Sequence, residues 1–272
     1  MLEYIVEMFS YPFMQRAFLV GILVSLCASL LGVSLVLKRY SMIGDGLSHV
    51  GFGALAVASA LNMAPLAVAV PVVILAAFIL LRLSDSGRLE GDAAIAMIST
   101  GALAVGVMVV SMTTGMNSDL NSYMFGSILA MSKSDVVLSV VLSVIVLVLY
   151  LLFYDKIFAV TFDAVFARAT GIRTGLYNML LAVLTSVTVV LGMRMMGALL
   201  ISSLIIFPAL TAMRVCKRYR SVILCAVAVS VVSFILGMTV SFLLATPAGA
   251  SIVIVDIVLY FIFWLAGAVR GK

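Results

Sequence analysis

The sequence has 272 residues, of which 65% are hydrophobic and only 10% are charged. Soluble domains carry about 25% charged residues, so a water-soluble globular protein is excluded. The net charge of +5 comes from basic residues dispersed near the ends of apolar segments, which gives no indication of nucleic-acid binding. The composition therefore predicts an all-α polytopic membrane protein with one transmembrane domain over residues 1–272.

The apolar runs predict the following order of elements. Residues 1–16 mix aromatic, aliphatic and charged side chains and predict a short interfacial helix. Nine spans follow, at about residues 17–37, 41–61, 66–83, 93–112, 136–154, 176–193, 197–213, 222–244 and 251–268. The connection at 194–197 is short enough to be a break within the bundle, so the sequence predicts a bundle of about 8–9 transmembrane helices.

Two polar insertions interrupt this series. Residues 113–135 predict an external loop with a short helix, and residues 155–175 predict a cytosolic loop. Within the second insertion, apolar side chains recur at helical spacing between Phe162 and Thr174, which predicts a short amphipathic helix. The periodicity fits a helix on the membrane surface and a docking helix for a soluble partner equally well.

The distribution of basic residues indicates an orientation. With the N-terminus outside, thirteen lysines and arginines fall in cytosolic segments and three fall in external segments. Such an excess on the cytosolic side is typical of multi-span proteins. It favours nine spans, or eight plus one hairpin-like element.

One stretch inside the second span carries ionisable side chains. It holds His49, the only histidine of the chain, and Asp45, four residues earlier. On a helix both side chains leave the same face. A charge near the bilayer centre costs roughly 2.5–3.5 kcal/mol on insertion scales, and such groups usually mark a site or a pathway. A carboxylate and an imidazole are a start for a divalent metal site. Alternatively, Asp45 ends a helix near the cytosolic face and His49 is an interior histidine with hydrogen-bond partners.

Other polar residues lie in the last spans. Pro208 removes a backbone hydrogen bond and favours a kink, and Ser202 and Ser203 lie one to two turns before it. These residues could line a pathway, although such kinks are also common in plain helical bundles. Asp256 in the last span is either a hydrogen-bonding group in the packing or a further pathway carboxylate.

Several motifs are absent. Cys27, Cys216 and Cys225 have no CxxC spacing, so neither a disulfide nor a zinc cluster is indicated. Glu3 and Glu7 occupy a start that lacks the basic region of a signal peptide. The chain has no GxxxxGK[ST] loop for nucleotide phosphates and no HExxH motif of a metalloprotease.

The chain resembles, over its whole length, the permease subunits of bacterial ATP-binding-cassette importers for zinc, manganese and iron. Seven segments in the family's order carry this resemblance: Tyr11–Arg16, Gly44–His49, Asp92–Ala96, Phe125–Leu129, Phe162–Gly171, Gly197–Ala209 and Thr246–Ala250. Gly46 stands where the family more often has alanine, and Asp256 belongs to none of these motifs.

The resemblance implies a homodimeric permease of the bacterial cytoplasmic membrane, without a permanently bound cofactor. It would receive a metal from an extracytoplasmic binding protein and be driven by two copies of a separate ATPase subunit. Asp45 and His49 are then expected to coordinate the ion. The cytosolic helix, with Phe162, Asp163, Phe166, Ala167 and Gly171, is expected to sit in a groove of the ATPase.

In this interpretation two Asp45/His49 pairs face each other across the dimer axis and form a transient site. Closure of the ATPase dimer would push the docking helices and switch the side that the site faces. The segment Met193–Leu200 looks more like zinc-type members, so zinc is the favoured metal, and manganese or iron stays open.

Two other functions fit part of the sequence. A proton-coupled secondary transporter would use Asp45, His49 and Asp256 as a relay. It leaves the amphipathic cytosolic helix unexplained, and the inverted repeats typical of such transporters are not evident. A membrane bundle with no transport role, such as an assembly factor, leaves the polar pair on one helix face without a purpose.

Overall fold

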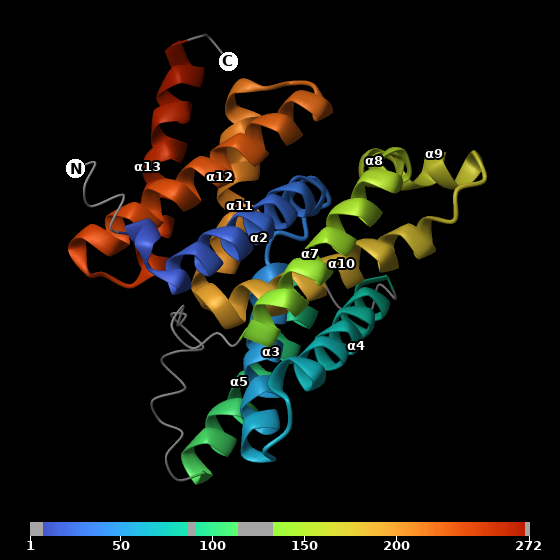
Figure 1. Cartoon of the computed structure of the whole chain (residues 1–272). Helices are drawn as coiled ribbons and strands as arrows, with labels where there is room; N and C mark the ends of the chain where they lie inside the picture. The colour runs from blue at the N-terminus through green and yellow to red at the C-terminus, as the bar shows by residue number, and fades with distance from the viewer. Residues whose placement is uncertain (1–7, 86–90, 114–132, 270–272) are drawn as a thin grey trace.

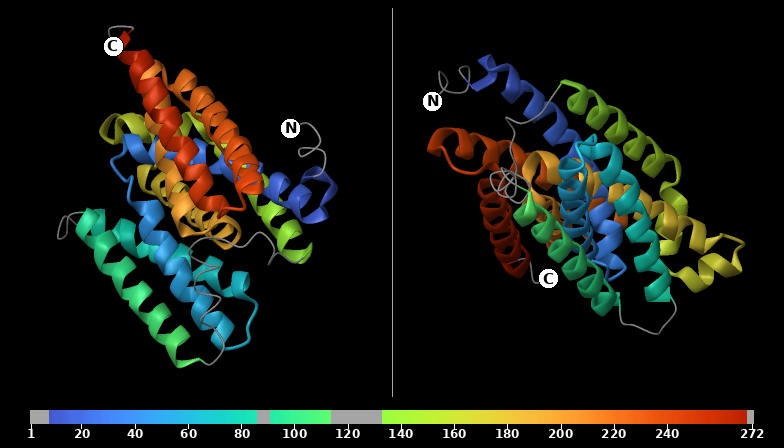
Figure 2. Two further views of the ribbon diagram at one scale, coloured as in Figure 1. Left: turned by 90° about the vertical axis from the view of Figure 1, so that its left-hand side faces the viewer. Right: turned by 90° about the horizontal axis from the view of Figure 1, so that it is seen from below.

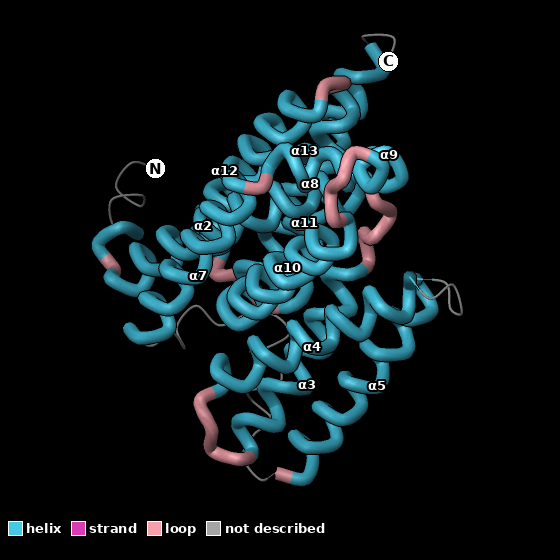
Figure 3. Tube along the Cα trace, turned by 90° about the vertical axis from the view of Figure 1, so that its right-hand side faces the viewer, coloured by secondary structure: helices cyan, strands magenta, loops and turns pink. Residues whose placement is uncertain are grey.

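The computed structural model describes residues 8–85, 91–113 and 133–269, and every regular element within these ranges is a helix (Figures 1 and 3). The elements are α2 (Pro12–Leu37), α3 (Ile43–Ala60), α4 (Pro65–Asp85), α5 (Gly91–Met112), α7 (Lys133–Leu152), α8 (Tyr154–Phe162), α9 (Ala164–Ala169), α10 (Thr174–Met196), α11 (Ala198–Val215), α12 (Tyr219–Leu244) and α13 (Ala248–Val269). The predicted all-α class is confirmed.

The long helices form two groups around a common centre. Helices α3, α4 and α5 pack together on one side of the molecule, and α12 packs beside α13 on the other (Figures 2 and 3). Helices α2, α10 and α11 lie between these groups, and α11 contacts both α3 and α13. More than half of the span residues are buried in each central helix, whereas 22% or fewer are buried in α5, α7 and α13. The exposed faces are the surfaces that lipid would cover.

In the described part of the chain, eight helices are long and apolar enough to cross a membrane. Helix α3 is not among them, although its 18 residues equal the length of α11, the shortest of the eight. Asp45 and His49 lower its mean hydropathy. The segment predicted as the second of nine spans is therefore a helix, but a more polar one than the others.

The predicted start of the first long helix is wrong by five residues, because α2 begins at Pro12 and not near Ala17. The backbone of Tyr11 is extended, and Pro12 occupies the first helical position, where its fixed φ and missing N–H are tolerated. Residues 12–16 thus belong to the long helix and not to a separate interfacial one. Residues 1–7 lie outside the described part of the chain, as does the loop at 114–132 with its predicted helix and the Phe125–Leu129 motif.

The short connection predicted at residues 194–197 is a break of one residue between two helices. Helix α10 ends at Met196 and α11 begins at Ala198, so Gly197 alone joins them. Its φ of 89° lies in the left-handed region, which glycine adopts without steric cost.

The predicted cytosolic helix over Phe162–Thr174 is wrong in its extent. Phe162 is the last residue of α8, a helix that the sequence analysis did not predict, and α9 is only six residues long. Asp163 separates the two helices because its extended backbone places its side chain at the N-terminus of α9. Gly171, with φ of 85°, lies in the turn that follows α9.

Candidate metal site

The candidate site is built on the first two turns of α3. Ile43 is the first helical residue, so Asp45 lies in the first turn. A carboxylate there interacts favourably with the unpaired N–H groups and the dipole of the helix. The hydroxyl of Ser48 donates to the main-chain oxygen of Asp45 at 2.7 Å, and so it does not bond to the Asp45 carboxylate. Local helix chemistry therefore stabilises an ionised Asp45 at this position.

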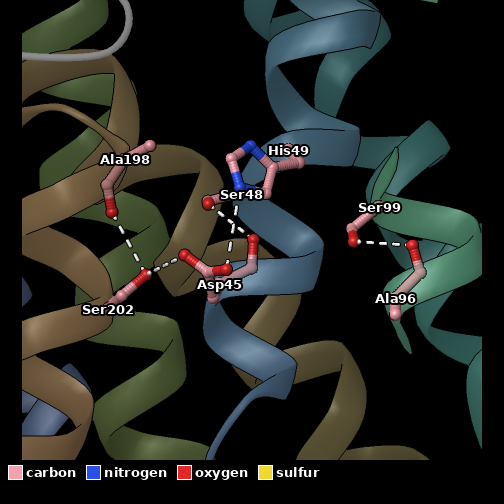
Figure 4. Close-up of polar contacts among 7 residues, drawn as sticks. All are labelled: Asp45, Ser48, His49, Ala96, Ser99, Ala198 and Ser202. Carbon is pink, nitrogen blue, oxygen red and sulfur yellow. Dashed lines mark hydrogen bonds and ion pairs between the residues drawn. The ribbon is translucent and has the colours of Figure 1, made fainter. Parts of the chain in front are cut away.

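Figure 4 shows the side chains of Asp45 and His49 next to each other on one face of α3. Asp45 Oδ2 and His49 Nε2 are 3.6 Å apart, and the two side chains remain 43% and 24% exposed. Two ligands of one tetrahedral ion with bonds of 2.0–2.1 Å lie about 3.4 Å apart. The pair is therefore spaced as two ligands of a shared cation, and both side chains can be reached from outside the chain.

Two glycines beside Asp45 let the neighbouring helices approach. A Cβ atom on Gly44 would lie 2.8 Å from the side chain of Ile205 on α11, and a Cβ on Gly46 would lie 2.5 Å from that of Ile95 on α5. The packing of Ile95 accounts locally for glycine at position 46, where the resembling family more often has alanine.

Helix α11 adds a hydroxyl to the site. Ser202 Oγ lies 3.4 Å from Asp45 Oδ1 and 3.2 Å from the main-chain oxygen of Ala198 (Figure 4). The neighbouring Ser203 does not reach the pair, because its Oγ donates to Asp256 Oδ2 at 2.9 Å. Asp256 itself is fully buried on α13. Pro208 is buried inside α11. The structure therefore brings Ser202 to Asp45, whereas Ser203 and Asp256 form a separate contact.

One chain provides few ligands. Within the described ranges no group of three or more His, Cys, Asp or Glu side chains lies close enough to hold an ion. Asp45 and His49 fill two positions of a tetrahedral site, and the hydroxyl of Ser202 is a weak third candidate. The described residues of one chain therefore supply only part of the ligand set of an ion.

The predicted docking residues lie together at α8 and α9. Phe162, Val165 and Phe166 are 59%, 81% and 66% exposed, whereas Ala167 is fully buried. Asp163 Oδ1 accepts hydrogen bonds from the backbone N–H groups of Val165 and Phe166 at 3.0 and 2.8 Å. The short helix therefore presents large apolar side chains outward from a capped N-terminus.

Sequence reasoning missed a buried cluster of hydroxyl groups at the end of the bundle nearest α8. The hydroxyls of Ser34, Tyr150 and Tyr219 lie 3.0–3.4 Å from one another and join α2, α7 and α12. The rings of Phe158 and Phe162 on α8 pack against the ring of Tyr219. Isolated hydroxyls in apolar segments carry no periodicity that would have identified these partners.

Comparison with known proteins finds relatives that match nearly the whole chain. The model of a family described as the ABC 3 transport family matches residues 10–267. The high-affinity zinc uptake system membrane protein ZnuB of Haemophilus influenzae is 30% identical over 244 residues, which are 90% of this chain and 94% of that protein. The manganese import system permease protein ScaB of Streptococcus gordonii is 27% identical over 265 residues, or 97% and 95% of the two chains.

A solved structure shows the same architecture. PsaBC from Streptococcus pneumoniae, determined in complex with Fab, superimposes with a TM-score of 0.87 at 27% identity. The match covers 97% of this chain and 95% of that chain. The similarity thus extends over both groups of helices and the central ones.

Proposed function

The chain belongs to the ABC 3 transport family, and on this premise we propose that it carries zinc into the cell along a pathway that contains Asp45 and His49. Its class follows from the family: it is the permease of a metal importer of the ATP-binding-cassette type and a multi-pass protein of the bacterial inner membrane. The ion is its cargo and not a resident cofactor.

The spacing of the Asp45 carboxylate and the His49 imidazole is the observation that carries the site assignment. The 3.6 Å between Oδ2 and Nε2 suits two ligands of one ion, and both groups sit on a helix that carries no other ionisable side chain. A sparse site also suits transport, because an ion held by few ligands can leave again.

Zinc is the proposed cargo, with manganese or iron as alternatives handled by the same mechanism. Imidazole and carboxylate bind zinc, manganese and iron, so the donor set alone does not choose. The relative named for zinc uptake has 30% identity, and the relative named for manganese import has 27%. The segment Met193–Leu200 resembles zinc-type members, which also supports zinc.

Two copies of the chain complete the proposed site. One protomer contributes an aspartate and a histidine, so a symmetric dimer that brings two α3 helices together supplies four ligands. An external binding protein would deliver the ion, because an importer of this class takes its substrate from such a partner.

A separate ATPase subunit is proposed to bind α9. Helix α9 has only six residues and is too short to span a membrane. The side chains of Phe162, Val165 and Phe166 form an exposed apolar surface that is not part of the core. ATP-driven closure of the ATPase would move α9 and, through α8, the cytosolic ends of α2 and α12. The buried hydroxyl cluster at Ser34 and Tyr219 is where that movement would enter the bundle.

Uptake of radioactive zinc and manganese into vesicles tests the proposal. The vesicles contain the permease, its ATPase and its binding protein, as wild type, Asp45→Ala and His49→Ala at matched expression. Thr239→Ala on the exposed face of α12 is the control, because its hydroxyl bonds only to its own helix. ATP-dependent zinc uptake that both site variants abolish and the control preserves is the expected result.

Two outcomes contradict the proposal. Normal uptake by both site variants would remove Asp45 and His49 from the pathway. Uptake that persists without ATP would instead favour a proton-coupled transporter.

A further inference from the structure

Asp256 is a buried acid that the proposed pathway does not use. It lies on α13 with no exposed surface. The two ion pairs among the described residues are His49–Asp45 and Arg194–Asp135, so no basic side chain in this part of the chain neutralises Asp256. Oδ2 accepts a hydrogen bond from Ser203 at 2.9 Å, and the hydroxyl of Ser233 on α12 also lies against the carboxyl group, but Oδ1 has no partner in hydrogen-bond geometry. A carboxyl kept in such a place calls for an explanation, because burying a polar atom without a partner is unfavourable.

Ser203, which bonds to Asp256, is adjacent in the sequence to Ser202, which contacts the candidate metal ligand Asp45. Ser203 bonds to Asp256 at 2.9 Å, and Ser202 lies 3.4 Å from Asp45 Oδ1. Both serines are on α11, so two short contacts connect the buried acid on α13 to the carboxylate on α3. Consecutive helical residues are about 100° apart around the axis. A rotation of α11 that breaks one contact therefore also displaces the other.

Hydrogen bonds between helices matter for helix positions in a lipid bilayer. Helices in a bilayer gain no hydrophobic driving force from packing together, so polar contacts contribute strongly to their rotation and register. Helix α13 packs against α11 and α12, while Ile254, Val258 and Phe261 on its other face are 50–62% exposed. Two side-chain hydrogen bonds join α11 to α13 in the described part of the chain: an exposed one from Arg214 to the hydroxyl of Tyr260, and the buried one from Ser203 to Asp256.

We propose that Asp256 is a positioning residue for the metal site: by accepting the hydrogen bond of Ser203 it fixes the rotation of α11 that presents Ser202 to Asp45. Asp256 does not touch the ion. This inference rests on the proposed function, because it assumes that Asp45 binds the cargo.

Three substitutions separate this role from the alternatives. Asp256→Asn keeps an oxygen that accepts from Ser203 but removes the acid, whereas Asp256→Leu removes the acceptor and keeps the branching at Cγ. Ser202→Ala removes the hydroxyl at the other end of the connection. A direct metal ligand requires the carboxylate, so it would not tolerate asparagine. A positioning residue requires only the acceptor.

The experiment measures the KM and maximal rate of ATP-dependent zinc uptake in vesicles with the complete transporter. We expect Asp256→Leu and Ser202→Ala each to raise KM roughly three- to tenfold, the range that corresponds to one hydrogen bond. Asp256→Asn should keep a KM close to that of the wild type. The double variant Ser202→Ala/Asp256→Leu should be no worse than the single ones, because both remove the same contact chain.

Ser230→Ala serves as the matched control, since Ser230 Oγ donates to the main-chain oxygen of Ser25 and joins α12 to α2 without bonding to α11. It should lower thermal stability without changing KM. A KM effect of Asp256→Asn as large as that of Asp256→Leu would identify a direct ligand and overturn the proposal. Additive effects of Ser202→Ala and Asp256→Leu, or an unchanged KM in Asp256→Leu, would also overturn it.

Asp45→Ala, measured in parallel, separates this inference from the proposed function. If Asp45→Ala transports zinc normally, the site assignment itself is wrong and the connection has no metal ligand to position. If Asp45→Ala is inactive while Asp256→Leu has a normal KM, only the role of Asp256 is wrong.

Discussion

The side chains of Arg194 and Asp135 form an ion pair that joins the end of α10 to the start of α7. Their Nη2 and Oδ2 atoms are 2.9 Å apart, and the two side chains are only 19% and 17% exposed. Arg194 Nη1 is buried without a hydrogen-bond partner, so the guanidinium depends strongly on Asp135. Breaking a buried pair from one side leaves an uncompensated charge.

Asp135→Ala should therefore destabilise the protein by on the order of 3 kcal/mol. The measurement is the thermal midpoint of the purified permease in mild detergent. Asp92→Ala is the control, because Asp92 is exposed in the first turn of α5. The double replacement Asp135→Leu/Arg194→Met should recover most of the loss, since it removes both charges. A midpoint that falls equally for Asp92→Ala would contradict the importance of the pair.

Single residues also show how far the sequence leads. Asp45 and His49 could be singled out because an acid and an imidazole at i, i+4 stand out within apolar segments. The contacts of Ser202 with Asp45 and of Ser203 with Asp256 could not be predicted. Each contact joins two residues more than 50 positions apart in the sequence. In many helices, moreover, a serine hydroxyl donates its hydrogen bond to a carbonyl oxygen of its own helix.

Among the short elements, α9 depends on its N-cap. Asp163 Oδ1 accepts two backbone hydrogen bonds, and a helix of six residues has little intrinsic stability. Asp163→Ala should cost about 0.5–2 kcal/mol and fray α9. The expected result is weaker co-purification of the ATPase, whereas Asp163→Asn should retain it. Full ATPase binding by Asp163→Ala would show that the cap is not needed for docking.

Among the long elements, α2 and α11 approach closely at a glycine. A Cβ atom on Gly32 would lie 2.1 Å from the main-chain oxygen of Ile205, which cannot move aside as a side chain can. Gly32→Ala should therefore force the helices apart and cost roughly 1–3 kcal/mol, as overpacking does. Gly101→Ala on α5 meets no atom within 4 Å and should be neutral or stabilising by about 0.4–1 kcal/mol. Equal thermal midpoints for the two variants would refute this contrast.

The positions of the helices were largely predictable, and their ends were not. Apolar runs locate the long helices because a bilayer requires about 20 apolar residues per span. Ends depend on caps and on backbone angles instead. Helix α2 starts at Pro12, before its apolar run begins. The helix predicted to start at Phe162 instead begins after Asp163, which caps α9. Helix α3 is harder to identify as a span because Asp45 and His49, the proposed ligands, make it more polar.

For the whole molecule, the number of ligands in one chain bears on the proposed dimer. The described residues of one chain offer no group of three or more metal-binding side chains, so Asp45 and His49 form half of a site if the dimer shares it. Two protomers with independent sites would each carry their own ion. A shared site would instead make each protomer dependent on its partner's ligands.

Heterodimers of one wild-type and one His49→Ala chain distinguish these arrangements. Two different affinity tags on the copies allow the mixed dimer to be purified and reconstituted with the ATPase and the binding protein. A shared site loses one of its two imidazoles, so uptake should fall far below half of the wild-type rate. Independent sites would leave one intact pathway and about half of the rate. A mixed dimer with Thr239→Ala, which lies away from the site, should transport at the full rate and shows that tagging and mixing are harmless.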